Sequence, residues 1–140
     1  MKEKLITFAV PCYNSQDYMQ RCLRSLMAGG EEVEIIVIDD GSTDRTGEIA
    51  DCYAEKYPET VRAVHQKNGG HGAGVNKGLS LAAGEYFKVV DSDDWLDEEA
   101  LKKLLTEIRK RKRQRALADL IICNYLYDHL YEGKQKSRHP

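Results

Sequence analysis

The sequence lacks paired cysteines and long apolar runs. Its 4 cysteines are scattered over 140 residues with no Cys-x-x-Cys pair, which is typical of a reduced, cytosolic protein. Near the N-terminus, the uncharged run before Pro11 covers only residues 5–10. This run is too short for the core of a signal peptide or for a membrane span. We therefore expect a cytoplasmic chain, and a position at the inner face of the membrane stays open.

An excess of charge of one sign is also missing. Lysine and arginine number 21 against 23 aspartates and glutamates, and the net charge of −2 gives no reason to expect nucleic acid as a partner. Basic residues nevertheless gather at residues 109–115, where they continue a helical pattern. We interpret this run as a solvated helix face. Peripheral contact with a membrane surface or an acidic partner is the alternative.

Short apolar runs alternate with segments of helical spacing, and no internal repeat interrupts them. The runs predict strands at residues 5–10, 33–38, 61–64, 86–90 and 120–123. Helices are predicted at residues 17–27, 45–57, 75–83 and 97–115, with a glycine-rich loop at 66–74. This alternation predicts an α/β fold with a mostly parallel sheet and helices on both faces. The predicted domain covers residues 1–131, and residues 132–140 form a polar tail.

Three local signals refine these boundaries. Pro11 is expected to end the first strand, because proline cannot continue a central ladder. Asn14 and Ser15 offer a cap for the helix that follows, and Ser42 and Asp44 offer one for the next helix.

The most informative segment is the carboxylate cluster at residues 91–94. Asp91, Asp93 and Asp94 directly follow an apolar strand, and like charges this close raise one another's pKa unless a cation lies among them. Oxygen ligands of this kind suit Mg²⁺ or Mn²⁺, which in turn bind phosphates. Capping of the next helix is the plainer interpretation, but residues 97–99 already supply carboxylates for that purpose.

Unusual residues follow three of the predicted strands, at residues 11–14, 39–42 and 91–94. In an open parallel sheet, the carboxyl ends of the strands meet where ligands bind. An aromatic ring could stack on a base, a carboxylate could accept from a base N–H or a ribose hydroxyl, and the acidic cluster could hold a metal that bridges a diphosphate. Residues 69–78 fit neither the Rossmann glycine motif nor the P-loop. The sequence therefore predicts a different kind of nucleotide diphosphate site.

Five blocks of sequence together resemble the ordered signature of family 2 glycosyltransferases with the GT-A fold. They lie at residues 10–14, 38–44, 76–79, 83–86 and 91–94. The resemblance covers residues 4–101 well and residues 119–128 more loosely. It implies a Rossmann-like GT-A domain that binds a nucleoside diphosphate sugar, with a uridine diphosphate sugar favoured. The family transfers the sugar with inversion to a glycan or lipid-linked acceptor, as in cell-surface polysaccharide synthesis.

The resemblance also implies roles for individual residues and a divalent cofactor, Mn²⁺ or Mg²⁺. Tyr13 would pack on the base and Asp40 would bond its edge. The nucleotide-binding residues carried over by position are Pro11, Cys12, Tyr13, Asn14, Asp39, Asp40, Gly41, Asn76, Asp91, Ser92 and Asp93. The metal ligands would come from Asp91, Asp93 and Asp94.

Two departures from the family pattern shape the expectation. Val75 stands where many members have an arginine, and the family's catalytic base belongs to a segment expected beyond Pro140. We therefore expect the donor-binding half of a glycosyltransferase, truncated at its C-terminus, and a nucleotide-sugar-binding module without turnover is the alternative. His71 is either a solvated loop residue or a contact to phosphate or sugar.

A less favoured alternative is a haloacid-dehalogenase-like phosphatase, because residues 91–93 mimic its nucleophile motif. That motif normally opens its domain, whereas here four predicted strands come earlier. A phospho-acceptor receiver, suggested by residues 39–40, lacks the lysine that a later strand would supply. Cys12 has no partner base in the sequence, which argues against a nucleophilic thiol.

Overall fold

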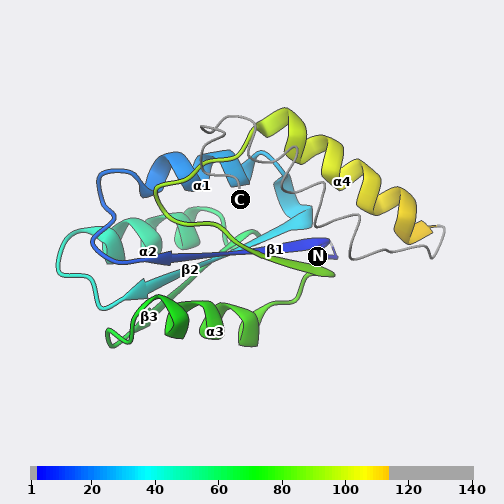
Figure 1. Ribbon diagram of the computed structural model, residues 1–140. Coiled ribbons are helices and arrows are strands. Elements are labelled where there is room, and N and C mark those ends of the chain that lie inside the picture. Colours follow the sequence, from blue (N-terminus) through cyan, green and yellow to red (C-terminus); the bar gives the residue numbers. More distant parts are fainter. Residues whose placement is uncertain (1–2, 114–140) are drawn as a thin grey trace, which may run out of the picture.

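The computed structural model of the chain describes residues 3–113. In this part, four strands form one parallel sheet in the order β3-β2-β1-β4 (Figure 1). The strands are β1 (Ile6–Cys12), β2 (Val33–Asp40), β3 (Val61–Gln66) and β4 (Tyr86–Val89). Because all four run in one direction, their carboxyl ends lie at one edge of the sheet.

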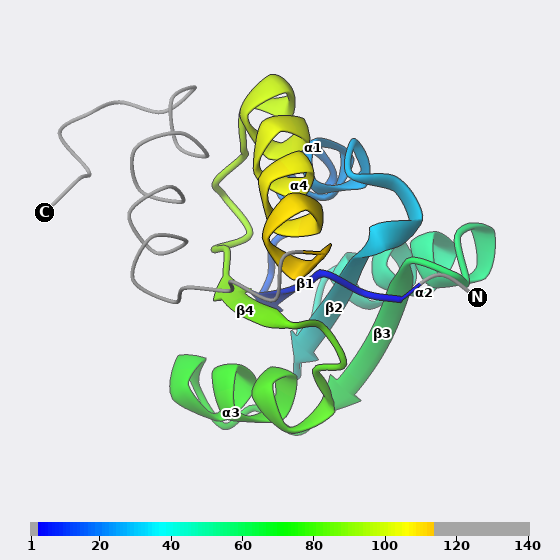
Figure 2. The same cartoon turned by 90° about the vertical axis from the view of Figure 1, so that its right-hand side faces the viewer.

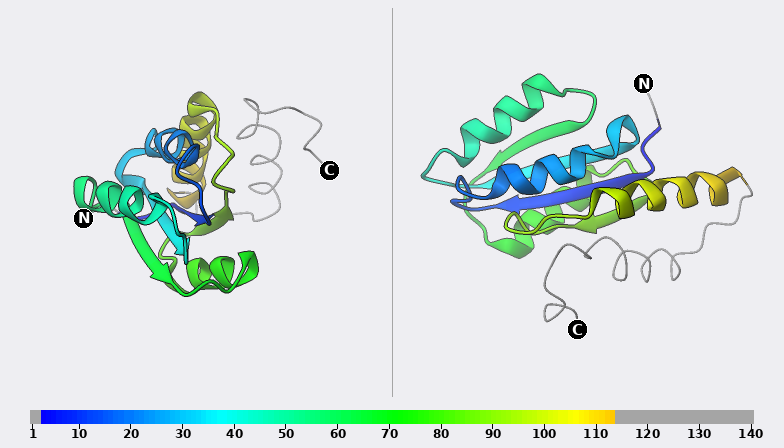
Figure 3. Two further views of the ribbon diagram at one scale, coloured as in Figure 1. Left: turned by 90° about the vertical axis from the view of Figure 1, so that its left-hand side faces the viewer. Right: turned by 90° about the horizontal axis from the view of Figure 1, so that it is seen from above.

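Helices cover both faces of the sheet, as the sequence predicts (Figures 1 and 2). Those of the described residues are α1 (Met19–Met27), the short 3-10 helix η1 (Gly30–Glu32), α2 (Thr46–Lys56), α3 (His71–Leu81) and α4 (Glu98–Arg113). Seen from above, α2, α1 and α4 lie side by side on one face (Figure 3). Only α3 covers the opposite face of the described sheet. The α/β prediction is therefore confirmed for this part of the chain.

The apolar core is split unequally by the sheet. On the face with three helices, Phe8 of β1 packs in a large cluster with Leu23 of α1 and Leu104 of α4, all fully buried. On the other face, Ala9 and Ile38 belong to a small cluster beneath α3. Strands buried on both faces read as continuous apolar runs. This is why β1 and β2 stand out in the sequence.

The prediction that Pro11 ends the first strand is wrong. Strand β1 continues to Cys12, and Pro11 is paired in register with Ile38 of β2. The carbonyl of Ala9 accepts the N–H of Val90 and so faces β4. Pro11, two residues later, faces the same side, where the pairing with β4 has already ended. Its missing N–H therefore removes no ladder bond.

Two further boundaries differ from the prediction. Helix α3 begins at His71, so the glycine-rich loop is shorter than predicted and ends at Gly70. Strand β2 includes Asp39 and Asp40, which the sequence placed in a loop. Glycine has a low helix propensity, and this hid the first turn of α3.

The predicted cap of the first helix is also wrong. The side chain of Asn14 accepts a hydrogen bond from Thr43 N–H at 2.8 Å, and Ser15 bonds the hydroxyl of Ser92 at 2.8 Å. Helix α1 begins only at Met19 and has no side-chain cap. Asp44, in contrast, accepts the N–H of Thr46 at 2.9 Å at the start of α2, as predicted.

Several predictions lie outside the described residues. They are the strand at 120–123, the end of the last helix beyond Arg113, the tail at 132–140 and the domain limit at 131. Cys123 also lies there, whereas Cys12, Cys22 and Cys52 form no disulfide within the described residues.

The described part of the basic run contacts acidic residues of the same chain. Arg109 lies 3.1 Å from Glu32, and Lys112 binds Glu3 and lies 2.9 Å from Glu85. These ion pairs hold α4 against the amino ends of the strands. Within residues 3–113, none of the helices is long and apolar enough to cross a membrane.

The close approach of α3 to the sheet depends on a glycine. A Cβ at Gly78 would lie 2.7 Å from the Cβ of Ala9, whereas a Cβ at Gly72 of the same helix would meet nothing within 4 Å. We expect Gly78→Ala to lower the free energy of unfolding by about 1 to 3 kcal/mol through overpacking. Gly72→Ala, the matched control, should leave it unchanged or raise it by up to about 1 kcal/mol. Urea unfolding measures both, and equal effects of the two substitutions would contradict this packing.

Candidate functional site

A small cavity opens at the carboxyl edge of the sheet. Its volume is about 110 Å³, and it is lined by Pro11, Cys12, Tyr13, Asp40, Gly70 and His71. These residues come from the end of β1, the end of β2 and the start of α3. The predicted meeting of the first two strand ends is therefore present in the structure.

Asp40 is held by the loop that leads into α3. Its carboxylate accepts hydrogen bonds from Gly69 N–H at 2.8 Å, from Gly70 N–H at 2.9 Å and from the side-chain amide of Gln66 at 3.0 Å. The bond from Gln66, followed by the two backbone bonds, lowers the pKa of Asp40 from its ordinary value. Asp40 is thus a buried but ionised carboxylate at the cavity.

The turn after Asp40 requires glycine. Gly41 has a φ of 73°, and a Cβ there would lie only 2.7 Å from the backbone nitrogen of Asn68. The side chain of Asn68 in turn donates to the carbonyl of Asp40 at 3.0 Å. Gly41 therefore allows the loop before α3 to pack directly on the end of β2.

Asp39 points away from the cavity. Successive side chains of a strand face opposite sides of the sheet, and Asp39 faces α2 rather than α3. One carboxylate oxygen accepts Ser42 N–H at 3.0 Å, and the other lies 2.9 Å from Nδ1 of His65. Of the two carboxylates of β2 that were predicted at the nucleotide, the structure brings only Asp40 to the cavity.

Tyr13 and Asn14 form the loop beyond β1. Tyr13 is 53% exposed and lines the cavity. Asn14 has a φ of 49°, and its N–H donates to the hydroxyl of Ser42 at 3.0 Å. Asn14 therefore ties the loops after β1 and β2 together and leaves the ring of Tyr13 accessible.

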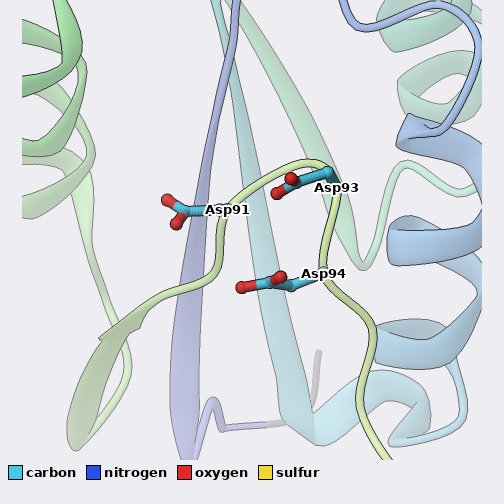
Figure 4. Close-up of side chains that lie close together, drawn as sticks. All are labelled: Asp91, Asp93 and Asp94. Carbon is cyan, nitrogen blue, oxygen red and sulfur yellow. The ribbon is translucent and has the colours of Figure 1, made fainter. Parts of the chain in front are cut away.

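Asp91, Asp93 and Asp94, here called the carboxylate triad, follow β4. Each can offer one oxygen such that the three atoms lie within 4.8 Å of one another. In Figure 4 the carboxylates of Asp93 and Asp94 point towards the segment that carries Asp91, whose own carboxylate lies on the far side of that segment. Nε2 of His71 lies 3.2 Å from Oδ1 of Asp91 and joins the triad to the cavity. The triad is thus continuous with the site formed by β1 and β2.

The donor set fits a hard divalent cation. Three carboxylates supply oxygen ligands of the kind that Mg²⁺ and Mn²⁺ prefer. None of the residues that line the cavity or form the triad is a lysine or an arginine. An anionic diphosphate would be repelled here unless a cation offset the charge of the carboxylates.

Ser92 and Asn76 lie outside the cavity lining, whereas Cys12 belongs to it. Ser92 is buried with its hydroxyl against Ser15, so its side chain faces inward. Asn76 lies on the exposed part of α3, one turn beyond the cavity. Burial, and then the charge of Asp39, raise the pKa of the Cys12 thiol to about 12, which excludes a thiolate nucleophile near neutral pH.

His71 is the cavity residue that sequence reasoning left undecided, and His65 was missed. The position of His71 became visible only once α3 was seen to begin there. Trp95, just after the triad, lies under the guanidinium of Arg21 at 3.5 Å from the ring centroid, which agrees with a packing role.

The contacts of Asp40 predict a pH-dependent contribution to stability. All three partners of the Asp40 carboxylate are N–H donors, and the side-chain NH₂ group of asparagine cannot accept from them. Asp40→Asn should therefore lower the free energy of unfolding at pH 7 by about 1 to 3 kcal/mol. Since folding lowers the pKa of Asp40, its contribution is full above about 3.9 and is lost as the pH falls through the folded value. Urea unfolding should therefore show a smaller difference between variant and wild type at pH 3. Glu55→Gln, at an exposed position of α2, should show little effect at either pH, and a constant gap for Asp40→Asn would contradict this assignment.

The sequence matches the family described as Glycosyl transferase family 2 over residues 7–136. It is 38% identical over 124 residues to the glycosyltransferase GlyG of Streptococcus pneumoniae, an alignment covering 87% of this chain and 39% of GlyG. It is 42% identical over 100 residues to the poly(ribitol-phosphate) beta-glucosyltransferase of Bacillus spizizenii, covering 69% of this chain and 16% of that protein. The chain thus spans about two fifths or less of these relatives.

Solved structures agree with this match. Residues 1–349 of TarS from S. aureus, in complex with UDP, superpose with a TM-score of 0.67 at 32% identity, covering 77% of this chain and 33% of that part of TarS. The same part of TarS with UDP-GlcNAc gives 0.67 at 33% identity, covering 77% and 32%. The phosphatase alternative gains no support from these matches. From its sequence and its Rossmann-like GT-A fold, the chain belongs to glycosyl transferase family 2.

Proposed function

We propose that this chain binds a nucleoside diphosphate sugar, with uridine favoured, through a divalent cation. We further propose that it serves inverting transfer of the sugar to a glycan or lipid-linked acceptor in cytoplasmic assembly of a cell-surface polysaccharide. The observation that carries the proposal is the meeting of Tyr13, Asp40 and the carboxylate triad at one edge of the sheet. TarS, described with UDP and with UDP-GlcNAc, supports the choice of uridine.

The base would bind at the β1 and β2 side of the edge. Tyr13 offers an exposed aromatic face on which a base can stack. Asp40 stays ionised, and its oxygens have lone pairs beyond those used by the loop, so it can accept from a base N–H. Pro11 and Cys12 line this end of the cavity and would contribute through their backbone, and Gly41 would contribute through the turn that follows Asp40.

The diphosphate would lie towards the carboxylate triad. Asp91, Asp93 and Asp94 would hold Mn²⁺ or Mg²⁺, and a bound cation of this kind offsets negative charge on a departing diphosphate. The imidazole of His71 lies between the cavity and Asp91, where its N–H could donate to a phosphate oxygen. Asn76, further along α3, is proposed as a more distant contact.

Three predicted residues would support the site through neighbours. Asn14 and Asp39 each bind a group of the turn at residues 42–43, and Ser92 binds Ser15 beneath the loop after β1. These contacts fix the loops that carry Tyr13 and Asp40. We propose that they position the nucleotide-binding groups rather than touch the nucleotide.

Metal-dependent binding tests the proposal directly. Calorimetric titration of the chain with UDP should give heat that depends on Mn²⁺ or Mg²⁺. Asp91→Asn and Asp93→Asn should each weaken binding at least about tenfold, the loss usual even for outer partners of a metal ligand. Glu98→Gln, an exposed carboxylate just beyond the triad, is the matched control and should bind as the wild type does.

Absence of metal-dependent heat with any nucleoside diphosphate would refute the proposed donor site. Release of UDP from UDP-GlcNAc, measured with and without an acceptor, separates an enzyme from a module that binds without turnover. The same two asparagine variants should abolish that release if the triad takes part in it.

Stacking of the base on Tyr13 gives a second test. Tyr13→Ala should weaken UDP binding by about 1 to 3 kcal/mol, whereas Tyr13→Phe should retain most of the affinity. Tyr18 is similarly exposed, at 43% against 53%, but does not line the cavity. Tyr18→Ala is therefore the control, and equal losses for the two alanine variants in calorimetry would argue against a base at Tyr13.

A further inference from the structure

His65, near the end of β3, contacts a carboxylate with each of its ring nitrogens. Nδ1 lies 2.9 Å from Oδ2 of Asp39, and Nε2 lies 2.7 Å from Oδ1 of Asp51. A neutral imidazole carries one N–H and can donate to only one of them, whereas the protonated ring donates to both. This contact set, here called the imidazole bridge, therefore requires a protonated His65.

The imidazole bridge joins three elements on the face of the sheet that α2 covers. Asp39 is the last but one residue of β2, His65 belongs to β3, and Asp51 lies on α2. Gly47 of α2 packs directly on the bridge, because a Cβ there would lie 2.8 Å from Oδ2 of Asp39 and 3.4 Å from Cε1 of His65. The space for the bridge is thus built into the packing of α2 against the sheet.

Contacts lead from the bridge to the proposed nucleotide site. The second oxygen of Asp39 accepts Ser42 N–H at 3.0 Å, and the hydroxyl of Ser42 accepts Asn14 N–H at 3.0 Å. Asn14 follows Tyr13, and Asp39 precedes Asp40. The side chain that His65 holds therefore anchors the turn that follows Asp40, and this turn binds Asn14, the neighbour of Tyr13.

We propose that His65 is a positioning residue for the nucleotide, and that its protonated form holds Asp39 and the turn at residues 39–43 in the binding geometry. The role in binding rests on the proposed function, whereas the imidazole bridge does not. His65 touches no residue of the carboxylate triad in the described contacts, so it acts through Asp39.

The surroundings of His65 set the direction of its pH dependence. The charged groups that contact it are Asp51 from α2 and Asp39 from β2, and Gly47 adds no charge. Asp51 first, and then Asp39, raise the pKa of His65 above its ordinary value of about 6.5. The imidazole bridge therefore stabilises the folded state fully below about pH 6.5. This stabilisation is lost as the pH rises through the pKa of His65 in the folded protein.

Asp51 allows the bridge to be changed at a distance from the site. It is exposed on α2 and contacts the nitrogen that faces away from Asp39. Asp51→Asn should lower the pKa of His65 and leave the contact to Asp39 in place. Glu55→Gln, one turn later on the same helix and also exposed, is the matched control.

The experiment uses the full chain and combines two measurements between pH 6 and 8.5. NMR titration follows the ring of His65, identified with His65→Gln, and nitrogen shifts show whether both ring nitrogens are protonated. Calorimetry with UDP and Mg²⁺ gives the affinity at each pH. We expect the affinity of the wild type to fall about tenfold across the titration of His65, the equivalent of one hydrogen bond.

Asp51→Asn should move the midpoint of this fall to lower pH by the same amount as the pKa of His65. At every pH, His65→Gln should have the affinity that the wild type shows at the high-pH end of its titration. Glu55→Gln should match the wild type at every pH. The role of His65 is overturned if the midpoint of affinity stays in place while its pKa moves, or if His65 titrates at or below about 6.5. No UDP binding by the wild type at any pH would instead overturn the proposed function, and the role of His65 with it.

Discussion

The carboxylate of Asp40, held by two backbone amides, determines the geometry of the whole edge. It accepts the N–H groups of Gly69 and Gly70 at the point where α3 is about to begin. Amides before a helix favour negative charge, because the helix dipole is positive at that end. The same contact keeps Asp40 ionised and fixes where α3 starts. His71 follows directly, and its contact with Asp91 brings the loop after β4 to the same place.

Two adjacent aspartates of β2 are stabilised in different ways. Asp40 faces α3 and is held mainly by amides that bear no net charge, so it remains a negative group at the cavity. Asp39 faces α2 and lies against an imidazole that a second carboxylate, Asp51, also contacts. The fold thereby separates a carboxylate available to a ligand from one that maintains the turn. The alternation of side chains along a strand makes this separation possible.

The edge is acidic, and carboxylates this close repel one another. Under the proposed function, a bound cation would relieve this repulsion. The rest of the structure offsets the instability through burial. Strands β1 and β2 have apolar cores on both faces, and α4 is fastened by ion pairs at the opposite end of the strands. The ion pairs of α4 and the proposed chemistry thus lie at opposite edges of one sheet.

The sequence alone determined the α/β class, the four described strands and the convergence of residues 11–14, 39–42 and 91–94. These features depend on local apolar runs and on the parallel direction of the strands, which a linear pattern records. The sequence did not determine that β1 extends through Pro11, which is possible because the pairing with β4 has ended there. Nor did it determine that α3 starts at His71, which follows the contacts of Gly69 and Gly70 with Asp40. The opposite orientations of Asp39 and Asp40, and the bridge at His65, were likewise decided only by tertiary structure. Contacts between β2, β3 and α2 join residues 14 to 26 positions apart, and no local pattern encodes such a meeting.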